Sequence, residues 1–205
     1  MLAPIVLAAG QSRRMGSPKA LLRDREGCPF VVRIVRTLAA AGFRAVTVVT
    51  GPASHEAIVA ALSAERSSDP AAARVRFALN DDPDRGQLSS IWVGIDAVSA
   101  PDVAGILLSL VDVPFVSERT IRAVADAYHA RPAPIVRPAD GLRHGHPVIF
   151  DRALFGELQR ADVAIGAKMV VRAHASETLD VPVSDEGAFL DIDTPEDYER
   201  AVGRV

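Results

Sequence analysis

The chain has 205 residues, 49% of them hydrophobic and 24% charged, a composition typical of one soluble globular domain. Its 23 basic and 26 acidic side chains give a net charge of −3, which argues against a nucleic-acid-binding protein and against a membrane-surface protein. The single cysteine, Cys28, excludes an internal disulfide and a cysteine-rich zinc site, and it favours a cytoplasmic location. We expect no leader peptide and no membrane span, because no apolar run reaches about 20 residues.

In chain order, short apolar segments alternate with helical patterns. Strands are predicted at residues 5–7, 45–50, 75–79 and 105–111, and several of these segments are apolar on both faces, as buried parallel strands are. Helices are predicted at residues 30–41, 53–65 and 90–98, and a surface loop is predicted at residues 63–74.

Two later helices carry clear start signals. Ser117 is a predicted N-cap, and Thr194-Pro195 combines a cap with a proline at the first helical position. After Pro132 the strand patterns become shorter, as at residues 147–150, and predict antiparallel edge strands. The alternation as a whole predicts an α/β fold in one domain over residues 1–205. We expect three α/β/α layers in a Rossmann-like arrangement, with a mixed, mostly parallel sheet.

The loop after the first strand is basic and contains two glycines. Gly10 allows a ligand to approach the main chain, and Arg13, Arg14 and Lys19 place three positive charges close together. Arginine and lysine bind phosphate groups, so the loop could hold a polyphosphate. Its spacing matches neither the P-loop nor the G-x-G-x-x-G pattern. On charge alone, a solvated basic loop remains the commoner explanation.

The full pattern of this loop is more specific than its charge. Residues 7–19 read LAAGQSRRMGSPK and closely resemble the L-A-A-G-x-S-x-R-M-G-x-x-K signature of MobA-like nucleotidyltransferases, in particular the molybdenum cofactor cytidylyltransferases. The resemblance implies that Arg14 reaches the outer phosphates and Lys19 the α-phosphate of a nucleotide. It places four residues along the base and ribose: Leu7, Ala8, Ala9 and Gly10. Relatives that use GTP carry L-A-G-G here, so Ala9 favours CTP.

Three further segments match motifs of this family in the same order. In residues 84–95, Gly86 and Ser90 match a segment that recognises the pyrimidine, although a serine at a helix start is also an ordinary cap. Asp112 matches the D-x-P motif at the end of an apolar strand and is a predicted Mg²⁺ ligand. The residue before it, Val111, departs from the small residue usual there. The D-I-D-T-P-E-D match offers Asp193 as the second metal ligand, with Asp191 as a possible alternative, since both would point to one face of a strand.

The segment at residues 141–150 contains two of the five histidines. Gly145 and His146 match the G-H-P motif of the family, which implies contact with the acceptor, and His144 is a further candidate for the acceptor phosphate. A turn with a structural histidine is the competing explanation. An H-x-H pair can also bind a metal, but no third ligand is apparent nearby.

The resemblance extends from Leu7 to Tyr198 and implies an Mg²⁺-dependent enzyme. The terminal phosphate of molybdenum-loaded molybdopterin would attack the α-phosphorus of CTP, and pyrophosphate would leave. Arg14, Lys19 and Asp112 would be the catalytic residues, and a recipient molybdoenzyme is an expected partner. Alternatives are another phosphorylated acceptor such as a sugar or polyol phosphate, GTP as the nucleotide, or a non-catalytic molybdenum cofactor carrier.

Overall fold

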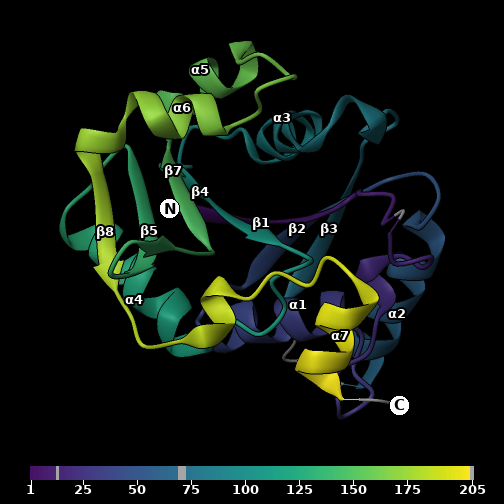
Figure 1. The fold of residues 1–205 in the computed structure, drawn as a ribbon. Helices are drawn as coiled ribbons and strands as arrows, with labels where there is room; N and C mark the ends of the chain where they lie inside the picture. The colour runs from purple at the N-terminus through teal and green to yellow at the C-terminus, as the bar shows by residue number, and fades with distance from the viewer. Residues whose placement is uncertain (13, 69–72, 204–205) are drawn as a thin grey trace.

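The computed structural model describes residues 1–12, 14–68 and 73–203, so Arg13 of the basic loop and residues 69–72 of the predicted surface loop lie outside the described part. It shows one mixed sheet between two layers of helices (Figure 1). This arrangement confirms the predicted α/β fold class. Among the described residues, no helix combines the length and the apolar character needed to cross a lipid bilayer.

The sheet contains eight strands among the described residues, in the order β3-β2-β1-β4-β7-β5-β6, and β8 pairs with β5. The first four strands are parallel, so their carboxyl ends lie at one edge of the sheet. β7 is antiparallel to both of its neighbours, and β8 is parallel to β5. The bounds are β1 (Leu2–Ala8), β2 (Ala45–Thr50), β3 (Arg74–Leu79), β4 (Gly105–Leu110), β5 (Ile135–Asp140), β6 (Arg143–His144), β7 (Val148–Asp151) and β8 (Thr178–Pro182).

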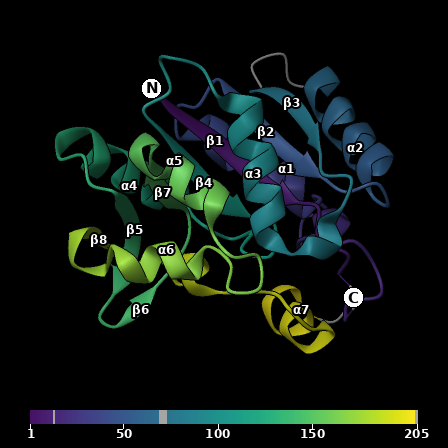
Figure 2. The same ribbon diagram turned by 90° about the horizontal axis from the view of Figure 1, so that it is seen from above.

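The helices cover both faces of the sheet. One apolar core lies under α1 (Phe30–Ala40), α2 (His55–Ser68) and α4 (Glu118–Ala130), and contains Val31, Ile58 and Val124. A second core lies under α3 (Gln87–Val98), α5 (Phe155–Arg160) and α6 (Lys168–Ala173), and contains Leu88 and Leu158. Figure 2 looks down onto this second layer. The last helix, α7 (Pro195–Val202), packs on the start of α1 through the smaller cluster Phe30, Ile192 and Val202.

Both predicted helix starts are confirmed. The Ser117 hydroxyl accepts a hydrogen bond from the Thr120 N–H, 3.3 Å away, at the start of α4. At the start of α7, Thr194 and Asp197 form a capping box in which each side chain accepts a bond from the other's backbone N–H. These local bonds satisfy backbone donors that have no partner inside the helix.

Several predicted bounds were wrong. α2 continues to Ser68, where a loop was predicted from residue 63, and α3 begins at Gln87 instead of residue 90. The predicted edge strand at residues 147–150 is β7, which is antiparallel as expected but lies inside the sheet between β4 and β5. β8 occupies the left end of the sheet in Figure 1 instead. β8 pairs with β5 in parallel. The short length of a strand was therefore no guide to whether it lies at the edge of this sheet.

Candidate active site

A cavity of about 370 Å³ opens at the carboxyl ends of β1 and β4. Its walls bring together residues from four distant parts of the chain, all predicted for the site: Leu7, Ala9, Gly10, Arg14, Lys19, Gly86, Ser90, Asp112 and Asp193. Ala8 alternates with these residues on β1 and is buried in the core on the α1 side. Ligands of open α/β sheets bind at this edge, because the loops after parallel strands meet there.

The loop after β1 is closed by its own hydrogen bonds. Ser12 has a φ of 50°, in the left-handed region, and its hydroxyl accepts a bond from the Lys19 backbone N–H over 2.9 Å. The Met15 N–H donates to the Ser12 carbonyl, also over 2.9 Å. Gly16 follows with a φ of 68°, which a glycine adopts without steric cost. These turns fix the point at which the Lys19 side chain enters the cavity.

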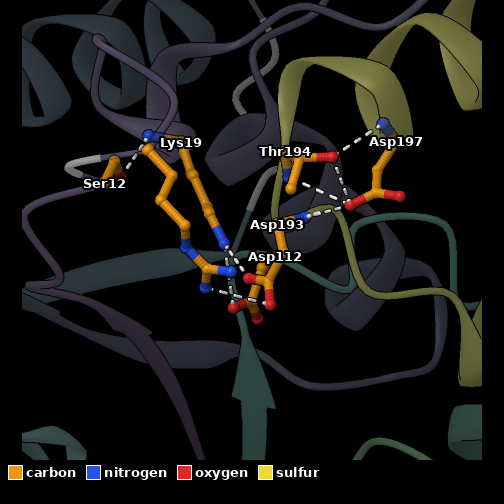
Figure 3. Close-up of polar contacts among 7 residues, drawn as sticks. Ser12, Lys19, Asp112, Asp193, Thr194 and Asp197 are labelled. Atoms are coloured by element: carbon orange, nitrogen blue, oxygen red, sulfur yellow. Dashed lines mark hydrogen bonds and ion pairs between the residues drawn. The ribbon is translucent and has the colours of Figure 1, made fainter.

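Lys19 joins two acids that are far apart in the sequence. Its Nζ lies 2.5 Å from Asp193 Oδ1 and 3.4 Å from Asp112 Oδ2. Dashed lines mark these contacts in Figure 3. The Lys19 side chain is only 10% exposed, whereas Arg14, which lies 3.2 Å from Asp193 Oδ2, is 69% exposed. The hydrogen bond from Lys19, reinforced by its charge and that of Arg14, holds the pKa of Asp193 below its usual range. The floor of the cavity is therefore a compact cluster of two cations and two carboxylates.

The C-terminal segment reaches this cluster through a main-chain contact. The Ile192 N–H donates to the Asp112 carbonyl over 2.8 Å, and the Ile192 side chain is fully buried. The prediction that Asp191 and Asp193 alternate on a strand was wrong, since the segment before α7 is irregular and docks on the loop after β4. Asp193 lines the cavity and Asp191 does not. Burial, followed by the negative charges of Asp112 and Asp193, raises the pKa of Asp191.

The side chains at this site can hold a hard divalent cation only if a bound substrate supplies further oxygen atoms. Among the described residues, no group of three or more His, Cys, Asp or Glu side chains is placed to hold a metal ion. Asp112 and Asp193 nevertheless turn carboxylate oxygens toward one point, because the same ammonium group reaches both. Mg²⁺ sites in proteins commonly use one or two carboxylates together with phosphate oxygens of the substrate. The pair therefore fits the predicted metal site once a phosphate is bound.

The opposite wall is the start of α3. Gly86 has a φ of 94°, a conformation that favours glycine, and Ser90 lies one turn further along the helix. Asn80, at the end of β3, donates from its amide nitrogen to the hydroxyls of Ser89 (2.9 Å) and Ser90 (3.0 Å). Sequence reasoning missed Asn80, because a single polar residue after a strand carries no motif.

The three predicted acceptor residues do not line this cavity. His144, on β6, lies 3.4 Å from Asp180, and Gly145 packs so closely that an added Cβ would lie 2.3 Å from the Ala188 carbonyl oxygen. The backbone N–H of His146 donates to the same carbonyl over 2.9 Å, and its buried ring Nδ1 has no hydrogen-bond partner among the residues that the structure describes. Burial lowers the pKa of His146, against the opposing effect of the Asp112 charge and a hydrogen bond to the Leu108 main chain. A role in acceptor binding stays a prediction for these residues.

The family model described as "MobA-like NTP transferase domain" matches residues 4–178. The chain belongs to this family. The match contains the loop after β1, the start of α3 and Asp112, and it ends before Asp193. Membership makes the chain a nucleotidyltransferase by family, and the predicted family relationship is confirmed at this level.

Two relatives align over almost the whole chain. A probable molybdenum cofactor guanylyltransferase from Natronomonas pharaonis is 27% identical over 98% of this chain and 96% of its own length. A protein from Paenarthrobacter nicotinovorans, named nicotine blue oxidoreductase, is 31% identical over 96% of this chain and 94% of its own length. The two names belong to different reaction classes, so the relatives do not by themselves define a substrate.

The fold is shared with solved structures of similar length. The crystal structure of Rv0371c from Mycobacterium tuberculosis H37Rv has a TM-score of 0.77 and 32% identity, and the alignment covers 99% of this chain and 97% of that one. A second structure of Rv0371c, in complex with manganese, has a TM-score of 0.73 and 28% identity over 99% and 98% of the two chains. The fold of this chain is thus shared with solved structures over nearly its whole length, and the family match makes it a nucleotidyltransferase fold.

Proposed function

We propose that this chain, as one nucleotidyltransferase domain over residues 1–205, transfers CMP from CTP to the terminal phosphate of molybdenum-loaded molybdopterin. An acceptor oxygen would form the new bond to the α-phosphorus while the bond to the bridging oxygen breaks. Pyrophosphate would leave with that electron pair. The dinucleotide product would pass in the cytoplasm to a recipient molybdoenzyme.

The observation that carries the proposal is the cluster around Lys19. One ammonium group, carried by the basic loop, lies within 3.4 Å of two carboxylates at the floor of a cavity whose opposite wall is the start of α3. Phosphoryl and nucleotidyl transfer need positive groups around the phosphates and an acid pair for a divalent ion. An acceptor phosphate is already anionic, so the reaction needs no strong general base.

Each charged residue then has a separate task. Lys19 would stabilise charge on the α-phosphate, and the more exposed Arg14 would hold the outer phosphates as they depart. Asp112 and Asp193 would hold Mg²⁺, which when bound supplies a Lewis acid for the phosphate oxygens. The manganese in one Rv0371c structure supports a divalent-metal site in a similar protein.

The identity of the nucleotide is the part of the proposal that has a specific alternative. Ala9 lines the cavity and replaces the first glycine of L-A-G-G, which favours CTP. The relative from Natronomonas pharaonis is named a guanylyltransferase, which favours GTP as the second candidate. Transfer to a sugar or polyol phosphate is a further alternative for the acceptor. A non-catalytic carrier of the cofactor is less favoured, because it would not need the two acids beside the phosphate loop.

The test is pyrophosphate release with each of the four NTPs, in the presence of Mg²⁺ or Mn²⁺. Molybdenum-loaded molybdopterin and a panel of polyol phosphates serve as acceptors, and mixtures without metal serve as controls. We expect release with CTP and the pterin only when metal is present. Turnover with a polyol phosphate but not with the pterin would replace the acceptor, and turnover with GTP alone would replace the nucleotide. Absence of release from any NTP would overturn the proposed function itself.

A further inference from the structure

The side-chain amide of Asn80 is fully committed to hydrogen bonds inside the protein. Asn80 is 4% exposed, and its backbone N–H continues the strand by donating to the Thr50 carbonyl over 2.8 Å. The Asp82 backbone N–H lies 3.1 Å from Asn80 Oδ1. A backbone N–H can only donate, so this contact fixes which end of the amide is oxygen. The nitrogen end therefore faces Ser89 and Ser90 and must donate to both hydroxyl oxygens.

This bond sets the polarity of the neighbouring Ser90 hydroxyl. A hydroxyl has one proton to donate and accepts through its oxygen. Because Ser90 Oγ accepts from Asn80, its own proton remains available for another group, and no acceptor for it is found among the described residues. Ser89 differs, since its hydroxyl donates to the Gly86 carbonyl over 2.8 Å. Of the two serines, only Ser90 lines the cavity.

We propose that Asn80 is a specificity-determining residue, which holds the Ser90 hydroxyl as a hydrogen-bond donor toward an acceptor atom of the nucleobase. The inference rests on the proposed nucleotidyl transfer. Cytosine offers two such acceptors on one edge, O2 and N3, whereas guanine presents N–H donors at the equivalent edge. A hydrogen-bond donor in the cavity wall, such as the Ser90 hydroxyl, therefore favours cytosine over guanine at this edge. Asn80 acts through Ser90 and touches no substrate atom itself.

Base analogues test the wild-type protein directly. 2-Thio-CTP weakens the acceptor at position 2, and 3-deaza-CTP removes the acceptor at position 3. We expect one of the two to lose about tenfold in kcat/KM relative to CTP, the size expected for one hydrogen bond. Equal kcat/KM for CTP and both analogues would overturn the inference while leaving nucleotidyl transfer intact. Turnover with GTP alone would also overturn it.

Variants then assign the effect to the two residues. Ser90→Ala removes the donor, so the analogue penalty should vanish. Asn80→Asp keeps the shape but replaces the amide donor by an acceptor, so Ser90 would donate to it and the penalty should vanish again. The double variant should lose no more kcat/KM for CTP than Ser90→Ala alone, because both changes remove one interaction. Ser89→Ala, which changes the other serine on the same amide, is the matched control and should keep the penalty.

Persistence of the analogue penalty in either Ser90→Ala or Asn80→Asp would refute the assigned roles. The assigned roles would also be refuted if the loss of kcat/KM for CTP in the double variant equalled the product of the losses in the two single variants. Thermal unfolding checks each variant, since Asn80 is buried. If Asn80→Asp does not fold, Asn80→Ala replaces it: with both amide donors removed, the hydroxyl is free to rotate and the penalty should shrink. An unchanged penalty in Asn80→Ala would then refute the role of Asn80.

Discussion

Replacing Lys19 by methionine is the sharpest test of the charge cluster. The substitution removes the ammonium group that lies 2.5 Å from Asp193 and 3.4 Å from Asp112, and keeps a long side chain in a position that is 10% exposed. One preorganised donor at a site of developing charge contributes about 10²–10³ in kcat, so we expect Lys19→Met to lower kcat by that factor. Stability should change by less than about 1 kcal/mol, because the two carboxylates are partly exposed and solvated.

The assay is pyrophosphate release with saturating CTP, metal and acceptor, combined with denaturant unfolding of the same sample. Lys168→Met is the matched control, since Lys168 is exposed on α6 and is the other lysine of the chain. The control should retain wild-type kcat. A Lys19→Met protein that is folded and keeps more than about a tenth of kcat would refute the role assigned to Lys19.

Three further outcomes follow from the same structure. Gly145→Ala should destabilise the protein by about 1–3 kcal/mol in denaturant unfolding, because its Cβ would lie 2.3 Å from the Ala188 oxygen. Gly156→Ala, whose Cβ meets only a flexible arginine end, should cost far less, and equal costs would contradict the packing argument. Burial alone would raise the pKa of Asp185, but hydrogen bonds from Thr120 and the α4 cap lower it. Its stabilising effect should therefore be present at neutral pH and fade as pH falls below about 4, so the Tm difference between wild type and Asp185→Asn should close in acid. Mn²⁺ binding, followed by electron paramagnetic resonance, should be tighter with CTP present, because the nucleotide phosphates would draw Lys19 and Arg14 away from the two carboxylates. Equal Mn²⁺ affinities with and without CTP would contradict this competition.

Local signals in the sequence predicted the parts of the fold that local bonds determine. The starts of α4 and α7 were found because Ser117 and Thr194 cap their own helices within three residues. The carboxyl ends of β1 and β4 could be placed together because parallel strands in an open sheet bring their following loops to one edge. That rule, with the family signature, was enough to collect most residues of the cavity.

Long-range contacts explain what the sequence did not predict. The alternation of Asp191 and Asp193 has the period of a strand, but the Ile192 N–H between them bonds to the Asp112 carbonyl instead of to a neighbouring strand. β7 is short, as edge strands often are, yet its pairing on both sides depends on contacts with β4 and β5 that its own residues do not encode. Asn80 became a candidate only when β3 and α3 were seen to place it against Ser90.

The contact between Ile192 and the loop after β4 makes the last part of the chain necessary to the site. A protein cut after β8 would keep all the described strands and the two large cores on either side of the sheet. It would lose Asp193, and Lys19 would retain a single carboxylate partner. Such a fragment could fold and still lack half of the proposed metal-binding pair, so we expect folding and the proposed activity to be separable. The family match, which stops at residue 178, covers β1 to β7 and ends at the first residue of β8, so it leaves out Asp193.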